Sequence, residues 1–209
     1  ALVKDYKGDA AATQTEAFDA SPANIDQRTA TSVLPNGMQL SLLAKGARGK
    51  AVSGSINLNF GDEKSLFGLD AVGEATAAML NKGTSTLSRQ QIQDKFDQLK
   101  AQVGFHGGAT GVNVNIKTTR DNLPAVITLV AEVLRNASFP ANALEEYKRQ
   151  MLAAIDEQRK DPQAVVQTEL GRYGNPYPKG DVRYAATFDE MVESIQSLTV
   201  EKLRAFHRQ

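Results

Sequence analysis

The chain of 209 residues has the composition of an ordinary globular protein, with 41% hydrophobic and 23% charged residues. Lys plus Arg equals Asp plus Glu at 24 each, so no net field favours nucleic acid or an anionic membrane. Cysteine is absent, which excludes disulfides, thiolate metal sites and a cysteine nucleophile. The most apolar stretch, residues 125–134, is too short to cross a bilayer, so no membrane insertion is expected.

The chain divides by composition into two parts. Residues 1–28 are small and polar with little periodicity, and are interpreted as a linker or extended arm arriving from an upstream domain. Residues 29–209 are expected to form one domain. The chain starts without Met and without a signal-peptide pattern, so it reads as a piece of a longer protein.

Apolar residues alternate with polar ones in several short segments, which predicts strands. Residues 32–34 and 38–42 flank Pro35-Asn36-Gly37 and are predicted to form a hairpin, with Asn-Gly supplying positive φ angles. Residues 55–60 and 112–117 alternate in the same way. Clean alternation buries one face only, which predicts an antiparallel sheet covered by helices on one face.

Helical periodicity fills the gaps between these strands. Helices are predicted at residues 69–80, 88–99, 121–134, from 142 through 155, 188–195 and 199–206. Expected caps are Ser88 with Gln91, Asp121 or Asn122, Asn142 with Glu145, and Thr199. The order of strands and helices predicts an α+β domain.

Four motifs in order carry a resemblance to a known family. Residues 68–84 end in Met79-Leu80-Asn81-Lys82-Gly83-Thr84, and this segment resembles the active-site helix of the pitrilysin/insulinase-type zinc peptidases, which include the mitochondrial processing peptidase. Leu34-Pro35-Asn36-Gly37, the Gly107-Gly108 hairpin and residues 175–184 also match that family. The resemblance covers residues 29–209 and implies a processing peptidase-like α+β module, continuing after Gln209 with another strand.

The resemblance also implies where a zinc site would lie. Active members carry H-x-x-E-H, in which two His at i and i+4 grip Zn²⁺ and the Glu is general base to the metal-bound water. In this chain the first His falls at Glu74, the Glu at Ala77 and the second His at Ala78. The third ligand falls near Ala153-Ala154, before Ile155. With all four groups missing, we expect no metal, no cofactor and no catalysis by this chain alone.

Other candidate sites are weighed against plainer interpretations. His106 and His207 lie on different predicted elements and cannot form a helical His pair, and His207 is expected at the C-terminal end of a helix. Asp156 and Glu157 lack nearby imidazoles. The glycines from Gly104 to Gly111 precede a strand, which argues against a phosphate loop.

A loose acidic group and two loop charges complete the candidates. Asp62, Glu63, Asp70 and Glu74 are better explained as solvated charges near a helix start than as a metal or acid/base site. Lys160-Asp161 and Lys179-Gly180-Asp181 are interpreted as loop charges.

The family architecture gives the functional expectation. Members consist of two homologous halves, each with two modules, that close around a peptide; one half holds zinc and the other does not. The resemblance implies that this chain is the first module of the zinc-free half, docking on a catalytic half or sister subunit and helping to enclose a peptide. The parent protein would then be a zinc metalloendopeptidase, and comparable bacterial proteins place it in the periplasm, with the cytoplasm left open.

Two other functions stay open at this point. The chain could be a purely structural subunit, like the peptidase-homologue core proteins of respiratory complexes. An enzyme with unrelated chemistry in the vacated cleft would need a pocket with strongly perturbed titratable groups.

Overall fold

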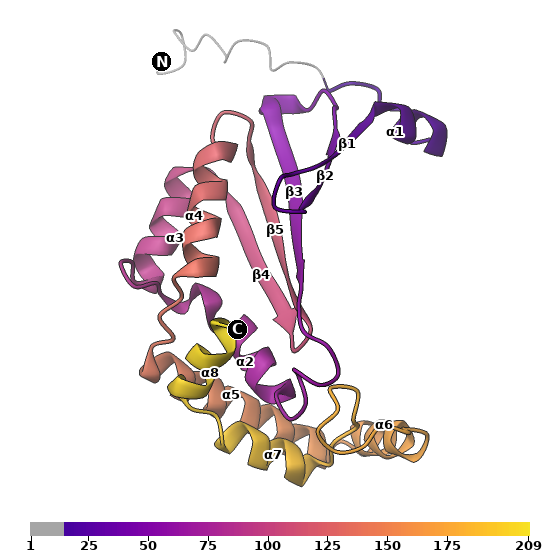
Figure 1. Cartoon of the computed structure of the whole chain (residues 1–209), viewed down its shortest axis with the longest axis vertical. Helices are drawn as coiled ribbons and strands as arrows, with labels where there is room; N and C mark the ends of the chain where they lie inside the picture. Colours follow the sequence, from indigo (N-terminus) through magenta and orange to yellow (C-terminus); the bar gives the residue numbers. More distant parts are fainter. Residues whose placement is uncertain (1–14) are drawn as a thin grey trace, which may run out of the picture. The chain divides into compact units, whose positions relative to one another are not determined.

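The computed structural model describes residues 15–209, which group into two compact units (Figure 1). The first unit contains the described residues up to Val52 together with residues 119–121, and the second contains residues 53–118 and 122–209. The hairpin at residues 29–43 therefore groups with the segment that precedes it. Residues 1–14 of the expected arm lie outside the described residues.

The first unit is built around a two-stranded hairpin. Its elements are α1 (Pro22–Arg28), β1 (Thr29–Val33), β2 (Gln39–Leu43) and a short 3₁₀ turn at Arg48–Lys50. The predicted hairpin is confirmed, with Val33 opposite Gln39 next to the turn. Only Gly37 in this turn has a positive φ, of 83°, so the expectation for Asn36 was wrong. Asn36 instead accepts a hydrogen bond from the backbone N–H of Met38 through its side-chain oxygen.

Residues 22–28, which the sequence placed in an extended arm, form the helix α1. Pro22 stands in its first turn, where the missing N–H is no loss because that group has no helical partner. The carboxylate of Glu16 pairs with Arg28 in the last turn and accepts from the backbone N–H of Gly46. The short helix is therefore held within its unit by a charged contact at its C-terminal end.

The second unit contains a three-stranded antiparallel sheet and most of the helices. Its elements are β3 (Ala51–Asn59, beginning in the first unit), α2 (Asp70–Met79), a 3₁₀ turn at Leu80–Lys82, α3 (Arg89–Gln98), β4 (Gln102–Gly108), β5 (Gly111–Thr119), α4 (Leu123–Arg135), α5 (Ala141–Lys160), α6 (Pro162–Tyr173), α7 (Phe188–Gln196) and α8 (Val200–His207). The strand order is β3-β5-β4, so β5 is central. The α+β class is confirmed.

The central strand β5 shows why this sequence forms a sheet. Val112, Val114 and Ile116 are each at most 8% exposed, whereas Asn115 and Lys117, on either side of Ile116, are exposed. This alternation has the two-residue period of a strand with one buried face. The tight connection to β4 pairs Gly108 with Gly111, which sets the register for the rest of the hairpin.

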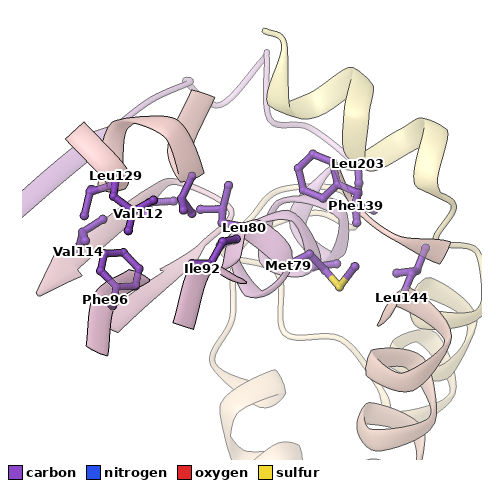
Figure 2. Packing of buried hydrophobic residues seen from close by; sticks show 14 of the residues in the cluster. Met79, Leu80, Ile92, Phe96, Val112, Val114, Leu129, Phe139, Leu144 and Leu203 are labelled. Atoms are coloured by element: carbon purple, nitrogen blue, oxygen red, sulfur yellow. The ribbon is translucent and has the colours of Figure 1, made fainter. Parts of the chain in front are cut away.

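One hydrophobic cluster joins β5 to the helices (Figure 2). Ile92 and Phe96 of α3 lie in the same cluster as Val114, and Figure 1 shows α3 and α4 beside the strands. At its other end the cluster contains Met79, Phe139, Leu144 and Leu203, all at most 2% exposed. The helix α2 thus lies within the core of the unit.

The predicted caps have mixed outcomes. Ser88 and Gln91 form the expected capping box of α3, and Thr199 caps α8 by accepting from Lys202 N–H. Asn122 makes no side-chain cap: its backbone angles are helical rather than extended, and its side-chain N–H donates to the carbonyl of Leu99.

The expected capping box at Asn142 was also wrong. The helix α5 begins one residue earlier, at Ala141, and its N-cap is Pro140 with extended backbone angles. Proline disfavours helical backbone angles in the residue that precedes it, so α5 does not extend further toward the N-terminus. The helix therefore has no side-chain cap at its N-terminus.

The helix α6, Pro162–Tyr173, is not predicted by the sequence patterns described above. The helix α5 ends at Lys160, and Asp161 then accepts from the backbone N–H of Gln163 as the N-cap of α6, with Pro162 in the first turn. Lys160 pairs with Asp156 and Glu157 within α5. Lys160-Asp161, which was interpreted as a pair of loop charges, therefore consists of the last residue of α5 and the N-cap residue of α6.

Candidate functional site

The helix α2 carries the three positions that correspond to the zinc motif. Val72, Ala75, Thr76 and Met79 are buried on it, as its predicted periodicity requires. Glu74 and Ala78 are exposed and lie one turn apart on the same face. Ala77 is only 4% exposed. The three positions therefore do not share one environment, because the first and third meet solvent and the second does not.

The reason is the close contact between α2 and the β4–β5 connection. A Cβ added to Gly73 would lie 2.6 Å from Cα of Ala109, and one added to Gly107 would lie 2.8 Å from Cβ of Ala77. Separations below 3.0 Å are closer than real Cβ atoms tolerate. Small residues one turn apart, Gly73 and Ala77, therefore let the helix pack directly on the hairpin backbone.

The expected third-ligand region lies on α5. Ala153 and Ala154 are both exposed, whereas Ile155 is 5% exposed and belongs to the core cluster. The helices α2 and α5 are in contact with each other. The structure thus brings the two predicted segments onto neighbouring helices, with alanine methyl groups at four of the five degenerate positions.

A carboxylate and a tyrosine are the titratable groups of this region. Partial burial raises the pKa of Glu74, and the negative charge of Asp70, one turn earlier, raises it further. Burial also raises the pKa of Asp70. Tyr147 on α5 has a raised pKa because of burial and because of the charge of Glu74. No motif in the sequence singles out Tyr147 as a site residue.

This arrangement offers little for metal or acid–base chemistry. Within residues 15–209, no group of three or more His, Asp and Glu side chains is placed to hold a metal ion. Glu74 has the carboxylate of Asp70 one turn before it, but Ala77 and Ala78 after it have only methyl groups and there is no imidazole among them. General base catalysis on a metal-bound water needs both the imidazole ligands and the adjacent carboxylate.

The two histidines lie on separate elements. His106 is an exposed residue of β4, opposite Asn113 of β5. His207 is the last residue of α8, as expected, and its Nε2 lies 2.6 Å from the carbonyl oxygen of Leu134. Its ring also meets Phe139 edge to face. His207 therefore joins α8 to the end of α4.

The remaining acidic candidates are engaged in local structure. Asp62 accepts from the backbone N–H groups of Lys64 and Ser65 in a turn. Glu63 pairs with Arg183 at 2.6 Å. Neither Asp62 nor Glu63 contacts Glu74 through these interactions. This supports the interpretation of the acidic residues near the start of α2 as turn and surface charges.

Arg183 is the centre of a charged network that the sequence analysis did not identify. It donates to Asp181 as well as Glu63, and its guanidinium lies 3.9 Å from the ring centroid of Tyr177. Its hydrogen bonds and charge lower the pKa of Asp181 to about 2. Asp181 is thus part of an ordered ion pair rather than a free loop charge. The signal available in the sequence was the Asp181–Arg183 spacing within the family-like motif.

A shallow polar depression of about 340 Å³ lies over the three strands. Asn113 of β5 donates to Oγ of Ser55 and Oδ1 of Asn57 on β3, at 2.8 and 2.5 Å, and His106 lies on its other side. Amide and hydroxyl groups therefore form a row across the strands. The glycines near this depression belong to strands, which agrees with the rejection of a phosphate loop.

Comparison with known proteins gives matches in structure. No protein-family model matches the sequence, and no curated protein matches it either. The peptidase M16 inactive domain from Pseudomonas fluorescens is similar, with a TM-score of 0.71 and 25% identity over 86% of this chain and 42% of that chain. A protease from Helicobacter pylori matches with a TM-score of 0.68 and 14% identity, over 86% of this chain and 42% of that one.

A third similar structure is a mutant of the ferredoxin protease FusC in complex with Arabidopsis ferredoxin. Its TM-score is 0.67 at 12% identity, over 94% of this chain and 21% of that chain. This chain therefore spans less than half the length of each of the three proteins. The second and third likenesses are of fold alone.

The α+β fold of this chain, with α2 packed on an antiparallel hairpin, is that of these peptidase-type structures. An inactive M16 peptidase domain among these structures supports the resemblance to a pitrilysin-type peptidase-homologue domain that the four motifs indicated. The similar Pseudomonas domain is described as inactive, which is consistent with a non-catalytic chain. Among residues 15–209 there is no helix with the length and apolarity needed to pass through a membrane.

Proposed function

We propose that this chain is a non-catalytic domain of a two-half zinc protease, in which it docks on a catalytic half and forms part of the wall around the peptide. The parent protein is then a zinc metalloendopeptidase, while this domain contributes shape and contacts. The observation that carries the proposal is the environment of α2. Its exposed positions Glu74 and Ala78 lack imidazoles, and the position of the general base, Ala77, is buried against the hairpin.

The peptide contact in this proposal is made by the sheet. We propose that helices cover one face only and that the opposite face, with Asn57, Asn113 and His106, borders the chamber. In the three-stranded sheet β4 is an outer strand, and it contains Gly104, Gly107 and Gly108. Glycines in a strand allow another backbone to approach closely, and an outer strand can accept an extended peptide through main-chain hydrogen bonds.

The first experiment measures metal and activity in the isolated chain. Elemental analysis after dialysis against zinc is expected to give far less than one zinc per chain. Incubation with an unfolded, fluorescently labelled peptide mixture is expected to give no cleavage. Stoichiometric zinc, or cleavage that a chelator abolishes, would contradict the proposal.

The second experiment separates a chamber wall from a purely structural subunit. Amide hydrogen exchange is followed with and without an excess of extended, apolar model peptides. Added protection is expected in β4, while the amides of β5, which already has neighbours on both sides, serve as the internal control. Exchange in β4 that no peptide alters would favour the structural subunit.

The compartment follows from the same proposal. Comparable bacterial proteins of this type are exported, and the absence of cysteine is compatible with that route. We therefore place the domain in the periplasm. Fractionation of cells expressing the full protein tests this, and its recovery with cytoplasmic markers would contradict it.

A further inference from the structure

The helix α6 carries an apolar stripe on its outer side. Val166, Leu170 and Tyr173 are 54%, 62% and 95% exposed and follow the i, i+4, i+7 spacing of one helix face. None of the twelve residues of α6 is buried, and among the described elements it packs mainly on α5 (Figure 1). The stripe borders a hollow of about 530 Å³ that Glu169 and Arg172 also line. Contiguous exposed apolar surface of this kind marks an interaction site.

The charges beside the stripe indicate what covers it. Glu169 and Arg172 each precede a stripe residue by one position, so both lie on the same flank. They form an ion pair of 3.0 Å within the helix. When two copies of one helix pack antiparallel about a two-fold axis, each flank faces the same flank of the other copy. An acidic and a basic residue on one flank are then complementary to themselves.

We propose that α6 mediates an antiparallel, two-fold symmetric contact with a second copy of this chain. With the axis near Leu170, that side chain meets Leu170 of the second copy, and Val166 meets Tyr173. Glu169 of each copy then lies next to Arg172 of the other. This inference is independent of the proposed function, since it uses neither the zinc-motif positions nor the sheet.

Sedimentation equilibrium of the whole chain tests the contact. A single helix–helix contact is at the small end of stable interfaces, so the dissociation constant is expected on the order of 10–100 µM. Leu170→Glu is expected to give a monomer, because it places two carboxylates at the axis. Ile127→Glu is the matched control, since Ile127 is an exposed aliphatic residue on α4, at 46%, and its variant should still dimerise.

A charge exchange tests the antiparallel arrangement itself. Glu169→Arg makes the flank wholly basic and Arg172→Glu makes it wholly acidic, so each variant alone is expected to be monomeric. An equimolar mixture should form a heterodimer, although neither chain regains its internal ion pair. Far-ultraviolet circular dichroism checks that each variant is folded.

Three results would overturn the proposal. The first is a wild-type chain that stays monomeric up to about 500 µM, a concentration well above the dissociation constant expected of a small interface. The second is a dimer that Leu170→Glu leaves intact. The third is a mixture of the two charge variants that remains monomeric.

Discussion

Gly73 of α2 faces the backbone of Ala109 so closely that a Cβ on Gly73 would lie 2.6 Å from the Ala109 Cα. A side chain there would also approach the ring of Phe206, at 3.1 Å. The backbone of the hairpin cannot give way as a flexible side chain can. This contact fixes how α2 lies on the β4–β5 connection.

Gly73→Ala is therefore expected to destabilise the chain by about 1–3 kcal/mol, since the strain of overpacking exceeds the gain in helix propensity. Urea denaturation followed by circular dichroism measures this. Gly171→Ala in α6 is the matched control, because a Cβ there meets nothing within 4 Å. The control should be neutral or stabilising by roughly 0.5–1 kcal/mol. Equal stability of both variants would show that the hairpin moves freely.

Ala77→Glu is expected to cost about 2 kcal/mol or more, because it places a carboxylate at a position 4% exposed and against Gly107. Ala78→Glu, one residue along on the exposed side, is the control and should change stability by less than about 0.5 kcal/mol. The measurement is again the free energy of unfolding in urea. A tolerated Ala77→Glu would mean that the site of the general base is open after all.

Glu74→His with Ala78→His is expected to create a weak zinc site, since two imidazoles one turn apart on an exposed helix face can share a metal. Isothermal titration with zinc measures it, and the wild-type chain serves as the blank. Adding Ala154→Glu or Ala153→Glu tests the third position. The correct one should tighten binding by roughly tenfold, which corresponds to about 1.4 kcal/mol. If neither does, the assignment on α5 is wrong.

Glu190 is expected to make stability depend on pH in acid. Its pKa is lowered to about 2 by the Thr187 backbone N–H, then by Lys179 and the Tyr184 hydroxyl. A lowered folded-state pKa gives stability that is present above the unfolded value, near 4.5, and is lost as the pH falls toward 2. Glu190 and Thr187 form the capping box of α7, and Glu190→Gln keeps its shape, so the variant should flatten the stability profile in that window. An unchanged profile would contradict the assignment.

Glu74 is expected to behave in the opposite way. Its raised pKa means that ionisation opposes folding, so the penalty is absent in acid and complete above the folded-state pKa. Glu74→Gln should therefore stabilise the chain at pH 7, and the gain should vanish as the pH falls below about 4. The pKa of Tyr147, followed by nuclear magnetic resonance, should fall toward its ordinary value. A Tyr147 pKa that does not change would place Glu74 outside its field.

Local signals predicted much of this structure, because alternation and caps act over a few residues. The box at Ser88 and the strand around Val114 followed from such patterns. The helix α6 escaped because its apolar residues cover no core and Asp161-Pro162 looks like a loop. Asn122 does not cap α4 because its backbone angles are helical and its side-chain N–H donates to the carbonyl of Leu99, which is distant in sequence.

In the candidate site, too, some features follow from local sequence spacing and others depend on contacts between distant segments. The positions of Glu74 and Ala78 on one helix face follow from their spacing. The burial of Ala77 does not, since it depends on the hairpin at Gly107, which lies thirty positions later in the chain. The nearness of Tyr147 to Glu74 likewise required the packing of two helices.

The contact between Ala77 and the hairpin also limits what substitution can restore. Restoring His, Glu and His at positions 74, 77 and 78 of α2 would supply the side chains of the zinc motif. A Glu at position 77 would still lack space, because the backbone of Gly107 lies against it. Recovering hydrolysis would require the neighbouring turn to be rebuilt as well. The lack of space beside Ala77 is therefore a property of the backbone, and we expect substitutions on α2 alone to leave it unchanged.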